Sequence, residues 1–174
     1  MNDFSGSDAF SKMYKEYYPK IYNYIFYRLL IKSDAEDIVS DIFLKVAANI
    51  SGYNPVKAAF GTWIFTIARN TLTDYLRKKR FHLSVDDEDF ELNILVETDM
   101  DAEIILDGKL KSMQKALQLL DEKSRELIAL KYWADMNNRE ISKLTGINES
   151  TVSTICVRAV TRLRKTLSVE FAGI

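Results

Sequence analysis

A single glycine between two helical segments constrains this 174-residue chain more than any other feature. Asn137 can cap a first helix, and Glu140 stands three residues later to complete a capping box. Gly146 then supplies the left-handed conformation that a tight helix exit needs. The second helix follows an Asn148 cap, and its inward apolar positions are Val152, Ile155, Ala159 and Leu163. The segment 137–165 therefore predicts a helix-turn-helix.

The opposite side of the second helix is polar and is expected to face solvent. Hydroxyl and arginine side chains can bond base edges and phosphates in a DNA major groove, and Val157 can meet a thymine methyl. Thr161 shares this outward side, and the candidate contacts with a duplex are Ser150, Thr151, Ser153, Thr154, Val157, Arg158, Arg162 and Lys165. The alternative is an ordinary helical hairpin with a merely solvated face, because helix-glycine-helix patterns are common in bundles.

Helical periodicity dominates the rest of the chain, so we expect an all-α protein built of two small helical domains. Two prolines and six glycines leave room for long helices, and 47% hydrophobic residues suffice for one medium domain or for two small ones, each with its own core. No apolar run is long enough to span a bilayer, and the N-terminus lacks a basic region followed by an apolar stretch. We therefore expect a cytoplasmic protein without membrane insertion. The single cysteine, Cys156, excludes an internal disulfide and is expected to fill the core.

Charge is unevenly distributed although the formal net charge is only -1. Arg77 to Arg80 form one basic block, and a second lies near the C-terminus. Between them, Ser84 to Asp101 carry acids and no basic residue. The predicted organisation is a domain over 1–82, an acidic linker over 83–101 and a domain over 102–174. The linker is either a solvated tether or an imitation of nucleic-acid charge, lying in a partner's basic channel or shielding the chain's own basic faces.

The first domain is predicted to begin with an aromatic-rich helix over Ala9 to Leu30, which Pro19 begins or kinks. The run 33–36 (Ser-Asp-Ala-Glu) predicts a capping box that starts a second helix, whose buried positions are expected to be Ile38, Ile42, Leu44 and Val46. This arrangement leaves exposed Glu36, Asp37, Ser40 and Asp41. Their acidic charge either compensates the helix dipole or forms a docking surface for a basic partner helix.

A third helix is predicted over Thr62 to Arg80, after a loop that contains the Asn54-Pro55 pair. Ideal helical geometry places Ile64, Ala68, Thr71, Leu72 and Tyr75 on one side. The other side and the basic end supply candidate contacts with single-stranded DNA: Trp63, Thr66, Asn70, Thr73, Arg77, Lys78, Lys79 and Arg80. For Trp63 the alternative is core packing against the preceding loop.

Three segments, taken together and in this order, resemble a known family. They are DAEDIVSDIFLKV (34–46), FGTWIFTIARNTLTDYLRKKR (60–80), and LDEKSRELIALKYW with REISKLTGINESTVSTICVRAVTRLRK (within 120–165). They are similar to the successive hallmarks of bacterial RNA polymerase sigma factors of the short extracytoplasmic-function (ECF) type. The likeness covers nearly the whole chain except the acidic linker.

The resemblance implies a sigma-2-like domain followed by a sigma-4-like domain. It implies that the helix at 34–46 binds the polymerase clamp coiled coil, with Glu36, Asp37, Ser40 and Asp41 as the candidate contacts. It implies that the helix at 62–80 and the loop before it recognise and open the minus-10 element, with Asn70 at a pocket for a flipped base and 77–80 on the backbone. The second helix of the helix-turn-helix would read the minus-35 element. The implied partners are core RNA polymerase, through its clamp and flap, promoter DNA and an anti-sigma factor.

The chain also departs from the family pattern. Ser40-Asp41 stand where Gln-Glu is common, so the polymerase contact is expected to differ in detail. The second helix carries Ser153, Ile155 and Val160 where basic residues are usual, and Val157 where histidine is frequent. The low charge of this helix predicts a weaker and less salt-sensitive minus-35 contact, and a promoter sequence that relatives do not supply.

The competing hypothesis is a stand-alone regulator that binds duplex DNA as a dimer through its helix-turn-helix. It leaves the helix at 34–46 and the Trp63 side without a role. Under either hypothesis we expect that the protein is not an enzyme and that it binds no cofactor and no metal. The sequence shows no phosphate-cradling glycine-rich loop and no metal-spaced His and Cys set, His82 stands alone, and 86–89 lack the glycine of a calcium loop.

Overall fold

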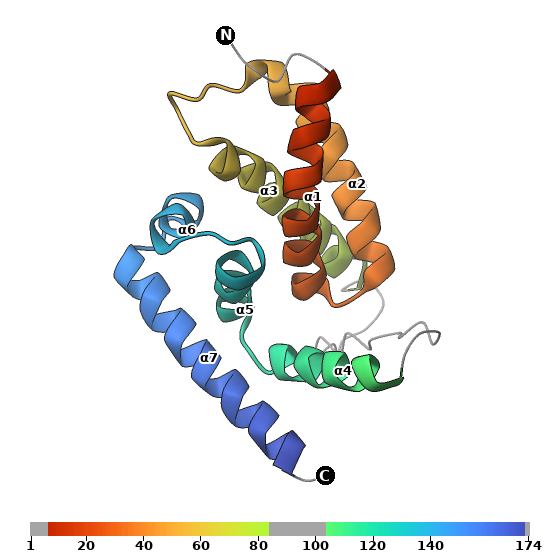
Figure 1. Ribbon diagram of the computed structural model, residues 1–174, viewed down its shortest axis with the longest axis vertical. Helices are drawn as coiled ribbons and strands as arrows, with labels where there is room; N and C mark the ends of the chain where they lie inside the picture. Colours follow the sequence, from red (N-terminus) through yellow and green to blue (C-terminus); the bar gives the residue numbers. More distant parts are fainter. Residues whose placement is uncertain (1–6, 84–103, 173–174) are drawn as a thin grey trace. The chain divides into compact units, whose positions relative to one another are not determined.

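The computed structural model describes residues 7–83 and 104–172, and side chains within 9–79 and 111–168. Its described residues are helical with short connections and contain no strand, as the all-α expectation required. They form two compact units, one holding α1 to α3 and the other α4 to α7 (Figure 1). Apart from Leu83, the predicted linker lies outside the described residues, as do the acidic run 86–89 and the side chains of Arg80 and His82.

The first unit is a bundle of three long helices, α1 (Ser7–Leu29), α2 (Lys32–Asn49) and α3 (Phe60–Leu83). A short 3-10 turn, η1 (Ile50–Gly52), follows α2. All three helices pack on one another, with α1 and α2 side by side in Figure 1. The fully buried side chains between them include Ile21, Tyr24, Ile25, Ile42, Ile64, Phe65 and Leu72. The ring of Tyr24 meets that of Phe65 edge-on at 5.7 Å, which joins α1 to α3.

Helix α1 continues through Pro19 and does not begin there. Proline removes the hydrogen bond to the carbonyl of Lys15, four residues earlier. Pro19 and Lys15 are both exposed, so water can satisfy that carbonyl. The helix ends at Leu29, and the next residue, Leu30, adopts a left-handed φ of 60°. That conformation costs roughly 1–2 kcal/mol in a residue with a Cβ, and the full burial of the Leu30 side chain offsets the cost.

Two expectations about α2 are wrong. The helix begins at Lys32 after an extended Ile31, and no side chain caps it, so the capping box predicted at 33–36 does not form. Leu44 is 70% exposed instead of buried, whereas Val39 and Phe43 join Ile38, Ile42 and Val46 in the core. The reason is the helical period, because Leu44 lies about 200° around the helix from Ile42.

The second unit contains α4 (Ile104–Gln118), α5 (Glu122–Ile128), α6 (Asn138–Thr145) and α7 (Glu149–Ala172). A π-helical turn, η2 (Ala129–Trp133), extends α5. Helices α4, α5 and α6 all pack against α7. Arg125 fixes the exit of α4 by donating hydrogen bonds to the carbonyls of Leu117, Gln118 and Leu120. These bonds satisfy carbonyls that the end of a helix leaves open.

The helix-turn-helix of α6 and α7 forms as predicted. Asn137 and Glu140 make a complete capping box, with bonds of 2.9 and 3.0 Å between side chain and backbone. Gly146 ends α6 with φ 76°, and its N–H bonds the carbonyl of Ser142. Asn148 caps α7 by accepting a 2.8 Å bond from the backbone N–H of Thr151. The turn therefore consists of one left-handed glycine between two capped helices.

Substitution of Gly146 tests this turn. Gly146→Ala should destabilise the protein by about 1 kcal/mol, because a Cβ disfavours the left-handed backbone while meeting no atom within 4 Å. Gly52→Ala is the matched control, since its Cβ also meets nothing and no left-handed φ is recorded there. Urea unfolding followed by circular dichroism measures both variants. Equal stability of the two would contradict the strain argument.

Candidate nucleic-acid interface

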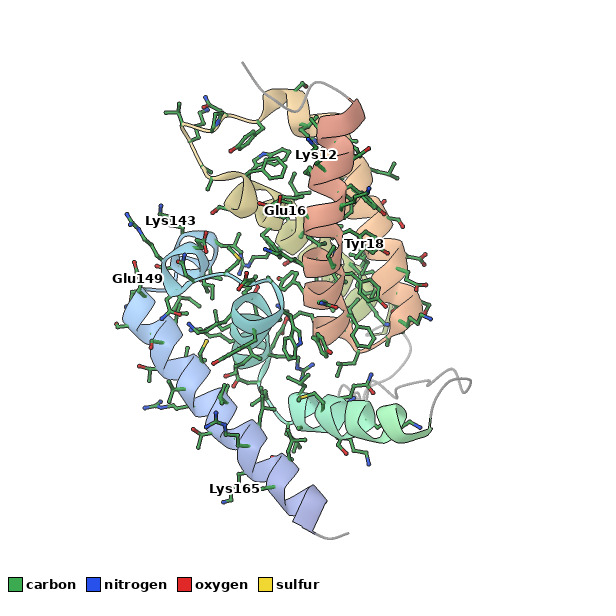
Figure 2. The ribbon with its side chains drawn as sticks, viewed as in Figure 1. Lys12, Glu16, Tyr18, Lys143, Glu149 and Lys165 are labelled. Carbon is green, nitrogen blue, oxygen red and sulfur yellow. The ribbon has the colours of Figure 1, made fainter. Side chains whose placement is uncertain are left out.

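The outward face of α7 carries the predicted duplex contacts together. Its inward side is formed by Val152, Cys156, Ala159 and Leu163, all buried. Cys156 thus takes the core position expected of it, while Ile155 is only half-buried. Opposite this stripe lie the exposed side chains of Ser150, Thr154, Val157, Arg158, Thr161, Arg162 and Lys165, with Ser153 and Thr151 half-buried. Figure 2 shows Lys165 on the side of α7 that faces away from α5.

Several hydroxyl groups on this face are already bonded within the helix. Ser150 Oγ donates to the capping oxygen of Asn148 at 2.9 Å. Thr154 Oγ1 donates to the carbonyl of Ser150, and Thr161 Oγ1 donates to the carbonyl of Val157, both at 2.9 Å. The exposed guanidinium groups of Arg158 and Arg162 therefore provide the hydrogen-bond donors best placed for a partner.

The outward side of α3 is polar along its length. Thr66, Asn70, Thr73 and Arg77 are exposed, as the helical period predicted, and Lys78 of the basic block is exposed as well. Thr66 and Thr73 each donate to the carbonyl four residues earlier, at 2.7 and 2.8 Å. Arg77 forms a 2.9 Å ion pair with Asp74, and both side chains remain largely exposed. A pair so exposed contributes little stability and leaves the arginine available to another anion.

Trp63 packs against the loop that precedes α3, as the alternative for this residue proposed. Its ring lies 5.2 Å from that of Tyr53 and 5.4 Å from that of Phe60, measured between centroids. Tyr53 also fixes the loop through a 3.0 Å bond from its hydroxyl to the carbonyl of Ala58. The indole is half-buried, so it shapes the junction between loop and helix.

Lys79 differs from Arg77 and Lys78 of the same basic block. Its Nζ donates to Asp34 Oδ2 at 3.0 Å and to the hydroxyl of Tyr75 at 3.1 Å. Tyr75 in turn donates to the same carboxylate oxygen. This Asp34–Tyr75–Lys79 cluster ties the start of α2 to the end of α3.

The cluster changes the acidity of its three members. Partial burial works against the carboxylate, but the hydrogen bonds from Tyr75 and Lys79 outweigh it and lower the pKa of Asp34. Burial and the neighbouring carboxylate raise the pKa of Tyr75. Burial works against the ammonium, but its bonds to Asp34 and Tyr75 raise the pKa of Lys79. The ion pair is therefore formed across the neutral range.

An acidic stripe lies on the exposed side of α2. Glu36, Asp37, Ser40 and Asp41 are all exposed, as predicted. Ser40 Oγ donates to the carbonyl of Glu36 at 2.9 Å, and Asp41 lies 3.9 Å from Lys45. Sequence reasoning missed Leu44, which extends the stripe. The signal was present, because positions 37, 40, 41 and 44 follow the helical period.

Both units match known family models. Residues 13–82 match sigma-70 region 2, and residues 110–163 match sigma-70 region 4. The chain is 30% identical over 171 residues to the ECF RNA polymerase sigma factor SigW of Bacillus subtilis, with 92% of this chain and 89% of SigW covered. It is 29% identical over 161 residues to the ECF RNA polymerase sigma factor BldN of Streptomyces coelicolor, and spans 61% of the length of that relative.

A solved structure shares the fold. The sigma factor RpoE of Bartonella quintana, crystallised with the anti-sigma factor NepR, superposes with a TM-score of 0.75 at 22% sequence identity. The match covers 92% of this chain and 97% of that one. Among the described residues, no helix is long and apolar enough to cross a membrane.

The Asp34–Tyr75–Lys79 cluster predicts a pH-dependent stability. Asp34→Asn should destabilise the protein by about 1 kcal/mol at pH 7, because Lys79 loses its counter-ion at a partly exposed site. The folded-state pKa of Asp34 is lowered, so its contribution is present above the unfolded pKa of about 4 and is lost as the pH falls through the folded value. The difference between the two proteins should therefore narrow below about pH 4.

Urea unfolding across pH 3 to 7 measures this difference. Asp37→Asn is the control, because Asp37 is exposed on the same helix and should show no such loss. Equal unfolding free energies of the native protein and Asp34→Asn at pH 7 would count against the cluster.

Proposed function

Because the chain belongs to the ECF type of bacterial RNA polymerase sigma factors, we propose that its two units engage one promoter at two separate elements. Members of this family bind core RNA polymerase and direct promoter-specific initiation, and this chain does so. The observation that carries the assignment is the match of region 2 on the first unit and region 4 on the second. Each unit then contributes particular exposed faces to that activity.

The second unit is proposed to read the minus-35 element. A recognition helix needs one side held by a small scaffold and the opposite side free to enter the major groove. The exposed face of α7 meets this requirement, with Arg158, Arg162 and Lys165 for phosphates and base edges. Thr151 contributes its backbone to the cap of α7, which positions the first turn of the helix.

The first unit is proposed to recognise and open the minus-10 element through α3 and its preceding loop. Extruding one base costs on the order of a few kcal/mol, and a pocket that holds the flipped base offsets this cost. Asn70 is the exposed amide that can bond a base edge, while Trp63 supports the loop at one side. Opening is then binding to a preferred single-stranded state, and it requires no catalytic group.

The basic block of α3 is proposed to act with two different roles. Arg77 and Lys78 are exposed and suit the DNA backbone. Lys79 is neutralised by Asp34, so its charge mainly orients the end of α3. We therefore propose that Arg77 and Lys78, and not Lys79, make the phosphate contacts that the sequence predicted.

The acidic stripe of α2 is proposed to bind core polymerase. Glu36, Asp37 and Asp41 provide negative charge for a basic partner surface. Leu44, exposed at 70%, places an apolar side chain at the end of the stripe. Protein interfaces commonly combine apolar contacts with neighbouring polar and charged groups.

Family membership disfavours the stand-alone dimeric regulator. That hypothesis gives the first unit no defined role, whereas this unit matches sigma-70 region 2 over residues 13–82. Attachment to bacterial RNA polymerase also places the chain in the cytoplasm under this proposal.

Regulation by an anti-sigma factor belongs to the proposal as well, since the structure of similar fold was solved with such a partner.

The core-binding proposal is tested by charge reversal. Asp37→Lys combined with Asp41→Lys should abolish co-elution with sigma-free core polymerase, because both substitutions oppose a basic partner. The native chain should co-elute and yield a promoter-dependent transcript. The control is Glu122→Lys on α5, an exposed acid outside the stripe. Unchanged co-elution of the double variant would reject this surface, and failure of the native chain to bind would reject the function.

The minus-10 proposal predicts a separate defect for Asn70→Ala. Open-complex formation should fall about tenfold or more, because the flipped base loses a hydrogen-bond partner, while binding to core polymerase stays intact. Permanganate reactivity of unpaired thymines reports opening, and co-elution reports assembly. Loss of core binding in this variant would show that the face has been assigned wrongly.

A further inference from the structure

The recognition face of α7 has few free hydroxyl donors. Thr154 and Thr161 each direct the hydroxyl proton to a carbonyl of their own helix, and Ser150 directs its proton to Asn148. A hydroxyl whose proton is engaged in this way can accept a hydrogen bond from a base but cannot donate one to it. Guanine presents only hydrogen-bond acceptors in the major groove, so these three hydroxyls cannot select guanine by donating a hydrogen bond to it.

What the threonines add to the surface is their methyl groups. One exposed face of α7 carries Thr154, then Val157 three residues later, and Thr161 seven residues after Thr154. At 100° per residue they fall within about 60° of one another, opposite the buried stripe centred on Cys156. Val157, between them, is 63% exposed and carries two methyl groups.

The stripe has the dimensions of a short run of base pairs. Seven residues of helix span about 10 Å, which equals roughly three base pairs at 3.4 Å each. Thymine is the one base that presents a methyl group in the major groove. Apolar side chains are the protein groups that recognise it there.

We propose that Thr154, Val157 and Thr161 form a methyl-reading stripe that selects thymine in the minus-35 element. The inference rests on the proposed role of α7 and adds the chemistry of the bases that it selects. Arg158 and Arg162 border the stripe on one side and hold the duplex against it through phosphate or base contacts. Selection then follows from removing methyl groups from water at the centre of the contact, while the flanking charge supplies affinity.

The test uses the reconstituted holoenzyme and a duplex promoter that it selects from a random-sequence pool. Each thymine of the minus-35 element is replaced singly by deoxyuridine, which lacks only the methyl group. We expect at least one replacement to weaken binding roughly fourfold, the effect of exposing one buried methyl. The thymine/uracil affinity ratio at that position is the quantity compared among variants.

Matched variants separate the methyl groups from the hydroxyls. Val157→Ala should bring the ratio at its position close to one. Thr154→Ser keeps the hydroxyl and should lower the ratio at its own position, whereas Thr154→Val keeps the branched methyl and should preserve it. Arg158→Ala should weaken binding to thymine and uracil duplexes equally and reduce the salt dependence. All these side chains are exposed, so the variants should fold, which circular dichroism checks.

The different failures are distinguishable. A holoenzyme that selects a promoter whose minus-35 element contains no thymine, or whose ratios are all one, overturns the methyl-reading stripe and leaves the sigma function standing. A ratio that persists in Val157→Ala and Thr154→Ser overturns it equally. Absence of any holoenzyme or selected promoter rejects the proposed function itself.

Discussion

The confinement of burial to one stripe of each helix decides what this protein can present to its partners. On α7 the buried stripe is Val152, Cys156, Ala159 and Leu163, and the direction of every outward side chain follows from it. The same constraint operates on α3, where Ile64, Ala68 and Leu72 face the bundle. Because a helix turns 100° per residue, moving either stripe by one position would rotate a different set of polar groups outward. Hydrophobic packing therefore positions the groups proposed to touch DNA.

Local hydrogen bonds refine what these faces can recognise. The threonines of α3 and α7 return their hydroxyl protons to the carbonyl four residues earlier, at Thr66, Thr73, Thr154 and Thr161. They contribute methyl groups and acceptors more than donors. Local contacts also set the availability of charge on α3, where the Lys79 ammonium bonds Asp34 and Tyr75 while Lys78 stays exposed. Neighbouring residues of one basic block thus acquire different capacities, and the three-dimensional surroundings of each residue set its role.

Errors in the sequence-based predictions have the same origin. Leu44 was expected in the core because it is apolar, yet its angular position turns it to the surface of α2, where it extends the acidic stripe. The capping box predicted at 33–36 had the right residue types, but it does not form because α2 already begins at Lys32, after an extended Ile31. For Trp63 the alternative of packing against the preceding loop is confirmed, since its ring contacts Tyr53 of the loop and Phe60 at the start of α3, while its contact with DNA stays a prediction. Both errors on α2 concern where the helix begins and which way its side chains point around the helix axis.

The sequence by itself determined the helices, the helix-turn-helix and the family. Capping residues and a left-handed glycine act over four or five residues, so Asn137, Glu140, Gly146 and Asn148 could be interpreted correctly without a structure. The tertiary structure alone decided that Lys79 is paired, because its partner Asp34 lies 45 residues earlier in the chain. The exposure of Leu44, in contrast, was already implied by the helical period. Short-range hydrogen bonding is determined by adjacent residues, whereas burial and charge pairing arise only when separate helices meet.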